Sequence, residues 1–220
     1  MGERLTRLRG LLFVAVLAAV LMGSTSLVSA DVVKLTTVPT SDGTAVWSWP
    51  GGSGYVSTTG EQAHSYYYSW QGSGWRVDGL MQFPLASLSA DTLSQATLSF
   101  FVLSCNDADL WYNDNSGTGT ITYDNSLDKV HVMDLQSLSN SWVDVDVTAN
   151  LLDALADGHG WATFTARYAT SAHSITVAMV EDPQGRGPYI TAVRGAAVPE
   201  PAGLSLSALG LALLARRRRR

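Results

Sequence analysis

The sequence predicts an all-β protein: an antiparallel β-sandwich with one short helix, flanked by an N-terminal signal helix and a C-terminal hydrophobic helix. Two observations support this prediction. Between the two ends, apolar residues recur mostly with a period of two, and clusters of Gly, Asn, Asp and Ser separate the short runs. Long apolar runs occur near the termini. We therefore divide the chain into residues 1–30, 31–197 and 198–220.

The first segment has the pattern of a removable secretory signal that uses the Sec machinery. Arg4, Arg7 and Arg9 form a basic region. An apolar run follows from Leu11 to Met22, and small residues at 28–30 offer a cleavage site before Asp31. The alternative interpretation is an anchor that is not cleaved.

The middle segment is acidic. The whole chain has 14 Lys and Arg against 19 Asp and Glu. Eight of the basic but only two of the acidic residues lie in the terminal segments, so residues 31–197 keep 6 against 17, a net charge of −11. Such a domain is not expected to bind nucleic acid or an anionic membrane surface. The only cysteine, Cys105, is expected to be a small buried residue at the end of a strand.

Period-two alternation predicts the strands of the sandwich. It is clearest where Val143, Val145 and Val147 alternate with Trp142 and polar residues. The predicted strands are Val32–Val38, Tyr66–Trp70, Trp75–Phe83, Ala96–Val102, Leu110–Tyr112, Gly119–Tyr123, Trp142–Thr148, Trp161–Tyr168, Ser174–Glu181 and Tyr189–Val193.

One helix interrupts the strands. Thr148 is predicted to cap it, and Leu151, Leu152 and Leu155 form its apolar stripe. Gly158 follows at the position where a left-handed residue ends a helix. This helix is expected to close one end of the sandwich.

Aromatic residues are the first candidates for binding. Tyr66, Tyr68 and Trp70 share one face of a predicted strand, with about 6.6 Å between successive side chains. The simplest interpretation is that this face is core, and the alternative is a platform on which sugar rings stack. Trp47 and Trp49 lie between glycines, serines and Pro50, in a stretch expected to be a loop, where they are further candidates for contact with polysaccharide.

Oxygen ligands gather in the segment NDADLWYNDN. Asp107, Asp109, Asn113 and Asp114 are hard donors of the kind that calcium prefers, although their spacing is not that of an EF-hand. Solvated carboxylates in a turn are the simpler interpretation. No other cofactor is expected.

The order of elements resembles the DNRLRE-type jelly-roll domain of bacterial surface proteins. The resemblance rests on Phe83 and Leu85, on the strand and helix start at Val143–Thr148, and on Pro188 with Tyr189. It departs at Gln82, where members of that family more often have Arg. The resemblance implies a fold similar to carbohydrate-binding modules, and domains of this sort often hold a structural calcium ion.

The last segment has three parts. Pro199, Glu200 and Pro201 prevent a helix from continuing out of the domain. Residues 202–215 are apolar and as a helix would span about 21 Å, short of a hydrocarbon core of about 30 Å. A basic cluster ends the chain: Arg216, Arg217, Arg218, Arg219 and Arg220.

This segment resembles the PEP-CTERM sorting signal of Gram-negative bacteria. The resemblance implies recognition by exosortase, transient anchoring in the inner membrane, and delivery to the cell surface or extracellular matrix. We expect a structural or adhesive protein that adheres to polysaccharide or to other surface proteins. It is not expected to be an enzyme, because no HExxH, GxSxG or phosphate-binding glycine motif is present. The alternatives are a secreted carbohydrate-active enzyme with an unrecognised pair of carboxylates, and a permanently anchored membrane protein.

Overall fold

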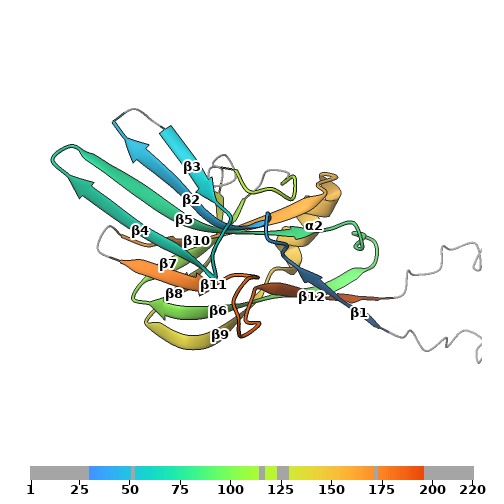
Figure 1. The fold of residues 1–220 in the computed structure, drawn as a ribbon. Coiled ribbons are helices and arrows are strands. Elements are labelled where there is room, and N and C mark those ends of the chain that lie inside the picture. The colour runs from blue at the N-terminus through green and yellow to red at the C-terminus, as the bar shows by residue number, and fades with distance from the viewer. Residues whose placement is uncertain (1–29, 51–52, 114–116, 123–128, 171–172, 196–220) are drawn as a thin grey trace, which may run out of the picture. The chain divides into compact units, whose positions relative to one another are not determined.

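The computed structural model describes residues 30–50, 53–113, 117–122, 129–170 and 173–195. This part of the chain is built almost entirely from antiparallel strands (Figure 1). The strands are β1 (Asp31–Thr36), β2 (Asp42–Trp49), β3 (Ser53–Ser57), β4 (Gln62–Trp70), β5 (Ser73–Pro84), β6 (Leu93–Cys105), β7 (Ala108–Asn113), β8 (Lys129–Leu135), β9 (Leu138–Asp146), β10 (Trp161–Tyr168), β11 (Ser174–Ala178) and β12 (Tyr189–Arg194). The predicted signal and C-terminal segments lie outside the described residues.

The strands form the two layers of a β-sandwich, which confirms the predicted fold class (Figure 1). The first layer is built on β6, which pairs with β9 along one edge and with β12 and β11 along the other, and β1 pairs with β12. The second layer is built on β5, which has β2 and β3 on one side and β10, β7 and β8 on the other. Strand β4 pairs with β11 and with β5, and so joins the two layers.

One hydrophobic core fills the space between the layers. Leu98 and Phe100 of β6 belong to the same buried cluster as Phe83 of β5 and Phe164 of β10. The rings of Phe83 and Phe164 meet edge to face, with centroids 6.2 Å apart. Cys105 is buried at the end of β6, as the sequence predicts.

Helix α2 (Thr148–Ala156) lies between the layers, at the end opposite the hairpins β2–β3 and β4–β5 (Figure 1). Leu151 and Ala154 are its buried residues. The predicted cap is wrong: Val147 is the N-cap, and no side chain caps the helix. The hydroxyl of Thr148 instead accepts the backbone N–H of Ala96 and donates to Asp146. Gly158 has the expected positive φ, 74°.

The sequence interpretation missed three strands and added one. β2, β3 and β8 were not predicted. The segment 119–122, predicted as the start of a strand, is not one, because Gly119 has a φ of 79° and interrupts the extended backbone. Ile121 of this segment packs instead against Ala45 and Leu80, on a second small cluster.

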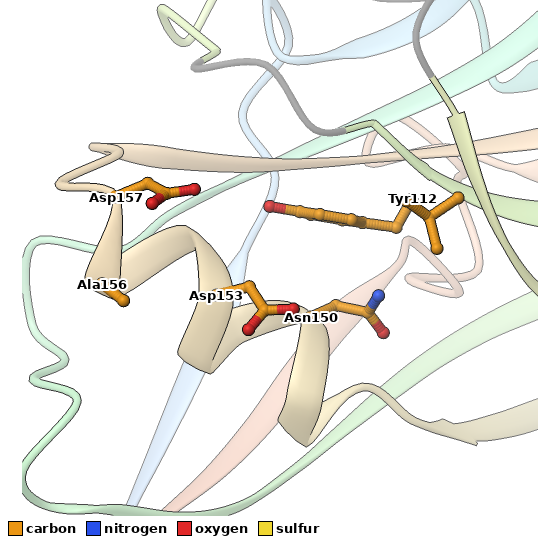
Figure 2. A pocket seen from close by; sticks show the side chains of 6 residues that line it. Tyr112, Asn150, Asp153, Ala156 and Asp157 are labelled. Carbon is orange, nitrogen blue, oxygen red and sulfur yellow. The ribbon is translucent and has the colours of Figure 1, made fainter.

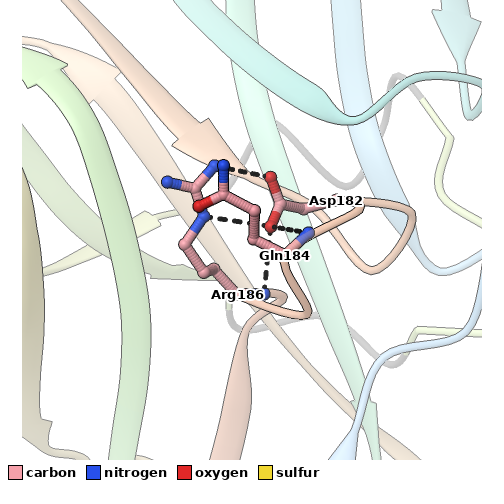
Figure 3. Close-up of polar contacts among 3 residues, drawn as sticks. All are labelled: Asp182, Gln184 and Arg186. Atoms are coloured by element: carbon pink, nitrogen blue, oxygen red, sulfur yellow. Dashed lines mark hydrogen bonds and ion pairs between the residues drawn. The ribbon is translucent and has the colours of Figure 1, made fainter.

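The carboxylate of Asp182 organises the turn in the connection from β11 to β12 (Figure 3). Asp182 accepts two hydrogen bonds from the guanidinium of Arg186, at 2.7 and 3.0 Å, and two from the backbone N–H groups of Gln184 and Arg186, each at 3.1 Å. These bonds, with the Arg186 side chain foremost, lower the pKa of Asp182 to about 2. The loop is therefore fixed in position beside the outer face of β6, where Arg186 lies over the ring of Phe101.

Within the described part of the chain, no helix is both long and apolar enough to cross a membrane.

Candidate functional site

The predicted aromatic stripe on β4 faces solvent. Tyr66, Tyr68 and Trp70 are 39%, 44% and 62% exposed. The interpretation of this stripe as core is therefore wrong, although its residues do share one face of a strand, as predicted. The side chains remain exposed because they lie on the part of β4 that projects with the hairpins at one end of the sandwich (Figure 1).

Aromatic residues of β5, the neighbour of β4, and of β3, which lies beyond β5 and β2, are exposed on the same side of the sheet. Trp75 of β5 pairs directly with Tyr68, and their rings stack with centroids 4.4 Å apart and planes at 23°. Tyr55 of β3 pairs with Val46 of β2, Val46 pairs with Val77 of β5, and Val77 pairs with Tyr66. The two tyrosines therefore lie in one cross-strand row. We call this surface the exposed aromatic face, and it comprises Tyr55, Tyr66, Tyr68, Trp70 and Trp75.

A two-residue hairpin turn brings β4 and β5 together here. Gln71 and Gly72 both have positive φ values, 47° and 84°, as a type I′ turn requires. This turn sets the register in which Trp70 opposes Ser73 and Tyr68 opposes Trp75. The predicted strands already ended and began on either side of this turn, so the pair of Tyr68 and Trp75 could have been found from the sequence.

Trp47 and Trp49 lie on the opposite side of the sheet from the exposed aromatic face. They belong to β2 and not to a loop, and they oppose Arg76 and Gly74 of β5. The rings of Trp47 and Trp49 are 5.5 Å apart, and that of Trp49 stacks on Tyr67 at 5.2 Å. The indole of Trp49 also covers Gly74, at a place where a Cβ would collide with it.

The five aromatic residues predicted to bind glycan are thus divided between two faces. Trp47 and Trp49 are half-buried among their neighbours, whereas Tyr66, Tyr68 and Trp70 are open to solvent. The structure joins only the second group into a continuous surface. The sequence missed Tyr55 and Trp75 as members of that surface.

The described members of the predicted calcium set, Asp107, Asp109 and Asn113, each have different polar partners. Asp107 pairs with His173, whose Nδ1 lies 3.1 Å from its carboxylate. Asp109, on β7, lies instead beside His131 and Asp134 of β8. Burial raises the pKa of Asp109, the charges of Asp134 and Asp107 raise it further, and His131 opposes them.

The other two predicted calcium ligands are Asn113 and Asp114. Asn113, at the end of β7, is buried and its side-chain oxygen accepts the hydroxyl of Thr165 at 2.7 Å. Asp114 lies outside the described residues. A calcium site formed by Asp107, Asp109 and Asp114 therefore stays a prediction.

A pocket of about 210 Å³ opens between helix α2 and the end of β7 (Figure 2). Tyr112 forms one wall, and Asn150, Asp153 and Asp157 line the other. Figure 2 shows both carboxylates on the helix side of the pocket. A glycosidase uses two carboxyl groups that flank the bond to be cut, and the alternative of a carbohydrate-active enzyme stays a prediction.

No model of a known protein family matches this chain, and a search of curated proteins finds no match.

Proposed function

We propose that this protein is exported, processed by an exosortase, and retained at the cell surface or in the extracellular matrix as a structural or adhesive module that binds polysaccharide. The observation that carries the proposal is the exposed aromatic face, whose five side chains are between 39% and 65% exposed. Isolated apolar residues on a surface need no explanation, but five aromatic residues on one face of three strands do.

The chemistry of this face suits a sugar polymer. Aromatic rings contact sugars through flat apolar surfaces, and Tyr hydroxyls and Trp N–H groups offer hydrogen bonds at the ring edges. Alternate residues of a strand are about 6.7 Å apart and adjacent strands about 4.8 Å apart, so Tyr66, Tyr68 and Trp70 follow one another along β4 and Trp75 lies beside them on β5. An extended chain of sugars can therefore contact several rings at once, which multiplies weak individual contacts.

Charge indicates the class of polysaccharide. Residues 31–197 carry 17 acidic against 6 basic side chains. A negatively charged domain repels a negatively charged polymer over several ångströms at physiological ionic strength. A neutral polysaccharide is therefore the expected ligand, in preference to one that carries uronic acids or sulfate.

The proposed localisation of the protein rests on its two terminal segments. The basic and apolar residues before Asp31 support export, and the Pro-Glu-Pro sequence with the terminal arginines supports processing by exosortase. Intact-mass measurement of the protein released from the cell surface tests this part of the proposal. A mature chain that still ends at Arg220 would contradict it.

Binding is tested with an array of neutral and acidic glycans, using the wild-type chain and two variants. Trp75→Ala removes a stacked ring from the exposed aromatic face and is expected to weaken binding about tenfold, which corresponds to about 1.4 kcal/mol. Trp142→Ala is the matched control, because Trp142 is a similarly exposed tryptophan on β9 of the other layer. Equal binding by wild type and Trp75→Ala, or a loss confined to Trp142→Ala, would contradict the proposal.

A further inference from the structure

Three metal-ligating side chains converge on the outer side of β7 and β8. The Nε2 atom of His131 lies 2.9 Å from Oδ1 of Asp134 and 3.9 Å from Oδ1 of Asp109. One ligand atom from each of the three residues lies within 4.8 Å of the other two. This group shares no residue with the exposed aromatic face, and metal binding there is independent of the proposed binding of polysaccharide.

A β-bulge creates the cluster. Asp109 directly opposes Asp134, and Leu110 opposes Met133, but Trp111 opposes His131 because the register shifts between Leu110 and Trp111. Without that shift, alternation along β8 would place His131 on the face opposite to Asp134. Bulges recur near functional sites, where they redirect a side chain, and this one redirects an imidazole toward two carboxylates.

The surroundings also favour a cation. Like charges that directly oppose each other across two strands are destabilising, and Asp109 and Asp134 form such a pair. The guanidinium of Arg167, which opposes Asp109 on β10, is directed to Asp78, with its Nε 3.1 Å from that carboxylate. His131 compensates the pair only when it is protonated, whereas a divalent ion would compensate both charges.

We propose that Asp109, His131 and Asp134 bind a divalent transition-metal ion, and that zinc matches this ligand set. Zinc accepts imidazole nitrogen and carboxylate oxygen at about 2.0–2.2 Å, which places neighbouring ligand atoms about 3.4 Å apart in a tetrahedron. Calcium requires six to eight oxygen ligands and does not suit the imidazole. The side chains of His131 and Asp134 are 44% and 65% exposed, so small rotations of both can close the site.

The proposed metal site lies at the edge of the sheet, where an external ligand can reach the ion. β8 ends the second layer among the described strands, and its outer edge pairs with no other described strand. Three protein ligands leave a fourth position, which water or an external donor can occupy. The indole of Trp111 meets the imidazole edge to face, with centroids 5.1 Å apart, and orients the ring at the site.

The test is calorimetric titration of the full-length chain with zinc chloride, using protein purified without a polyhistidine tag. We expect one saturable site in the wild type and at least about a hundredfold weaker binding by His131→Ala and by Asp134→Asn, since loss of a ligand exceeds the cost of losing an outer-shell contact. His173→Ala is the matched control, because His173 also pairs with a carboxylate, that of Asp107. This control should bind zinc as the wild type does.

A thermal melt provides a second measurement. Excess zinc should raise the melting temperature of the wild type and of His173→Ala, but not that of His131→Ala, because a ligand that binds only the folded state stabilises it. Three outcomes would overturn the proposal: no saturable zinc binding by the wild type, undiminished binding by His131→Ala, or a site that binds calcium and not zinc.

Discussion

Asp42 is a fully buried carboxyl at the start of β2, and its ionisation should limit the stability of the protein at neutral pH. Its Oδ2 accepts the hydroxyl of Thr37 at 2.7 Å and the backbone N–H of Val180 at 2.9 Å. Its Oδ1 is buried without a hydrogen-bond partner among the described residues. Burial, with a further contribution from the charge of Glu181, raises the pKa of Asp42 to about 6 against the two hydrogen bonds.

The sign of the effect follows from proton binding. Well below pH 3.8 the carboxyl is neutral in both the folded and the unfolded state. Between the unfolded value of 3.8 and the folded value of about 6, the folded state binds more protons, so the free energy of unfolding falls as the pH rises. Above about pH 6 the folded protein carries the whole penalty, which is about 3 kcal/mol for a shift of this size.

The variant Asp42→Asn isolates this effect. An amide oxygen can still accept the bonds from Thr37 and Val180, but asparagine has no charge to bury. Urea unfolding at a series of pH values, followed by tryptophan fluorescence, gives the free energy of unfolding of each protein. Between about pH 3 and pH 7, the variant should gain about 3 kcal/mol relative to the wild type.

Asp182→Asn provides the contrast, because the pKa of Asp182 is lowered to about 2. Its folded state ionises before its unfolded state, so this carboxylate stabilises the protein above about pH 4, and the contribution is lost as the pH falls toward 2. As the pH rises from 2 to 4, the free energy of unfolding of the variant should therefore fall relative to that of the wild type. Above pH 4 the difference between the two proteins should stay constant. A pH-independent difference for Asp42→Asn, or one that shrinks toward neutral pH, would refute the reasoning.

Two substitutions test the packing of the sandwich. Gly74→Ala should destabilise the protein by about 2 kcal/mol, because the added Cβ would collide with the backbone oxygen of Tyr68 and the indole of Trp49. The control is Gly160→Ala, where the added Cβ meets nothing. This variant should leave the melting temperature nearly unchanged. Phe164→Ala should lower the free energy of unfolding by about 3–5 kcal/mol in urea, since it removes a fully buried ring from the core. Val130→Ala, at an exposed position, should cost less than about 0.5 kcal/mol, and an equal loss in both would contradict this account of the core.

Several strands were visible in the sequence. β10 was predicted with its observed bounds, Trp161–Tyr168, and in β9 Val143 and Val145 are buried while Trp142 is exposed. β2 was missed because Gly43 and the flanking serines and glycines have the composition of a loop. These residues form a strand because they pair with β3 and β5, and the local sequence carries no information about that pairing.

The exposed aromatic face was partly predictable from the alternation of residues along a single strand. Tyr66, Tyr68 and Trp70 come from one strand, so their spacing alone places them together. Whether they face the core or solvent depends on how far the hairpin β4–β5 projects from the sandwich, and that is a property of the whole fold. Tyr55 joins the face only through pairing across β2 and β5, which are separated from it in the sequence.

The cluster of Asp109, His131 and Asp134 could not be found in this way. Strand pairing brings Asp109 opposite Asp134, and a single extra residue then decides on which face His131 lies. A slip of one residue moves a side chain to the other face of a sheet, so a prediction of this cluster needs the register to the residue. The same bulge breaks the alternation of β8, which hid the strand as well. The irregularity that conceals β8 from a pattern search is thus what brings its histidine to the carboxylates, and a variant that restored regular pairing should lose zinc binding while keeping all three ligands.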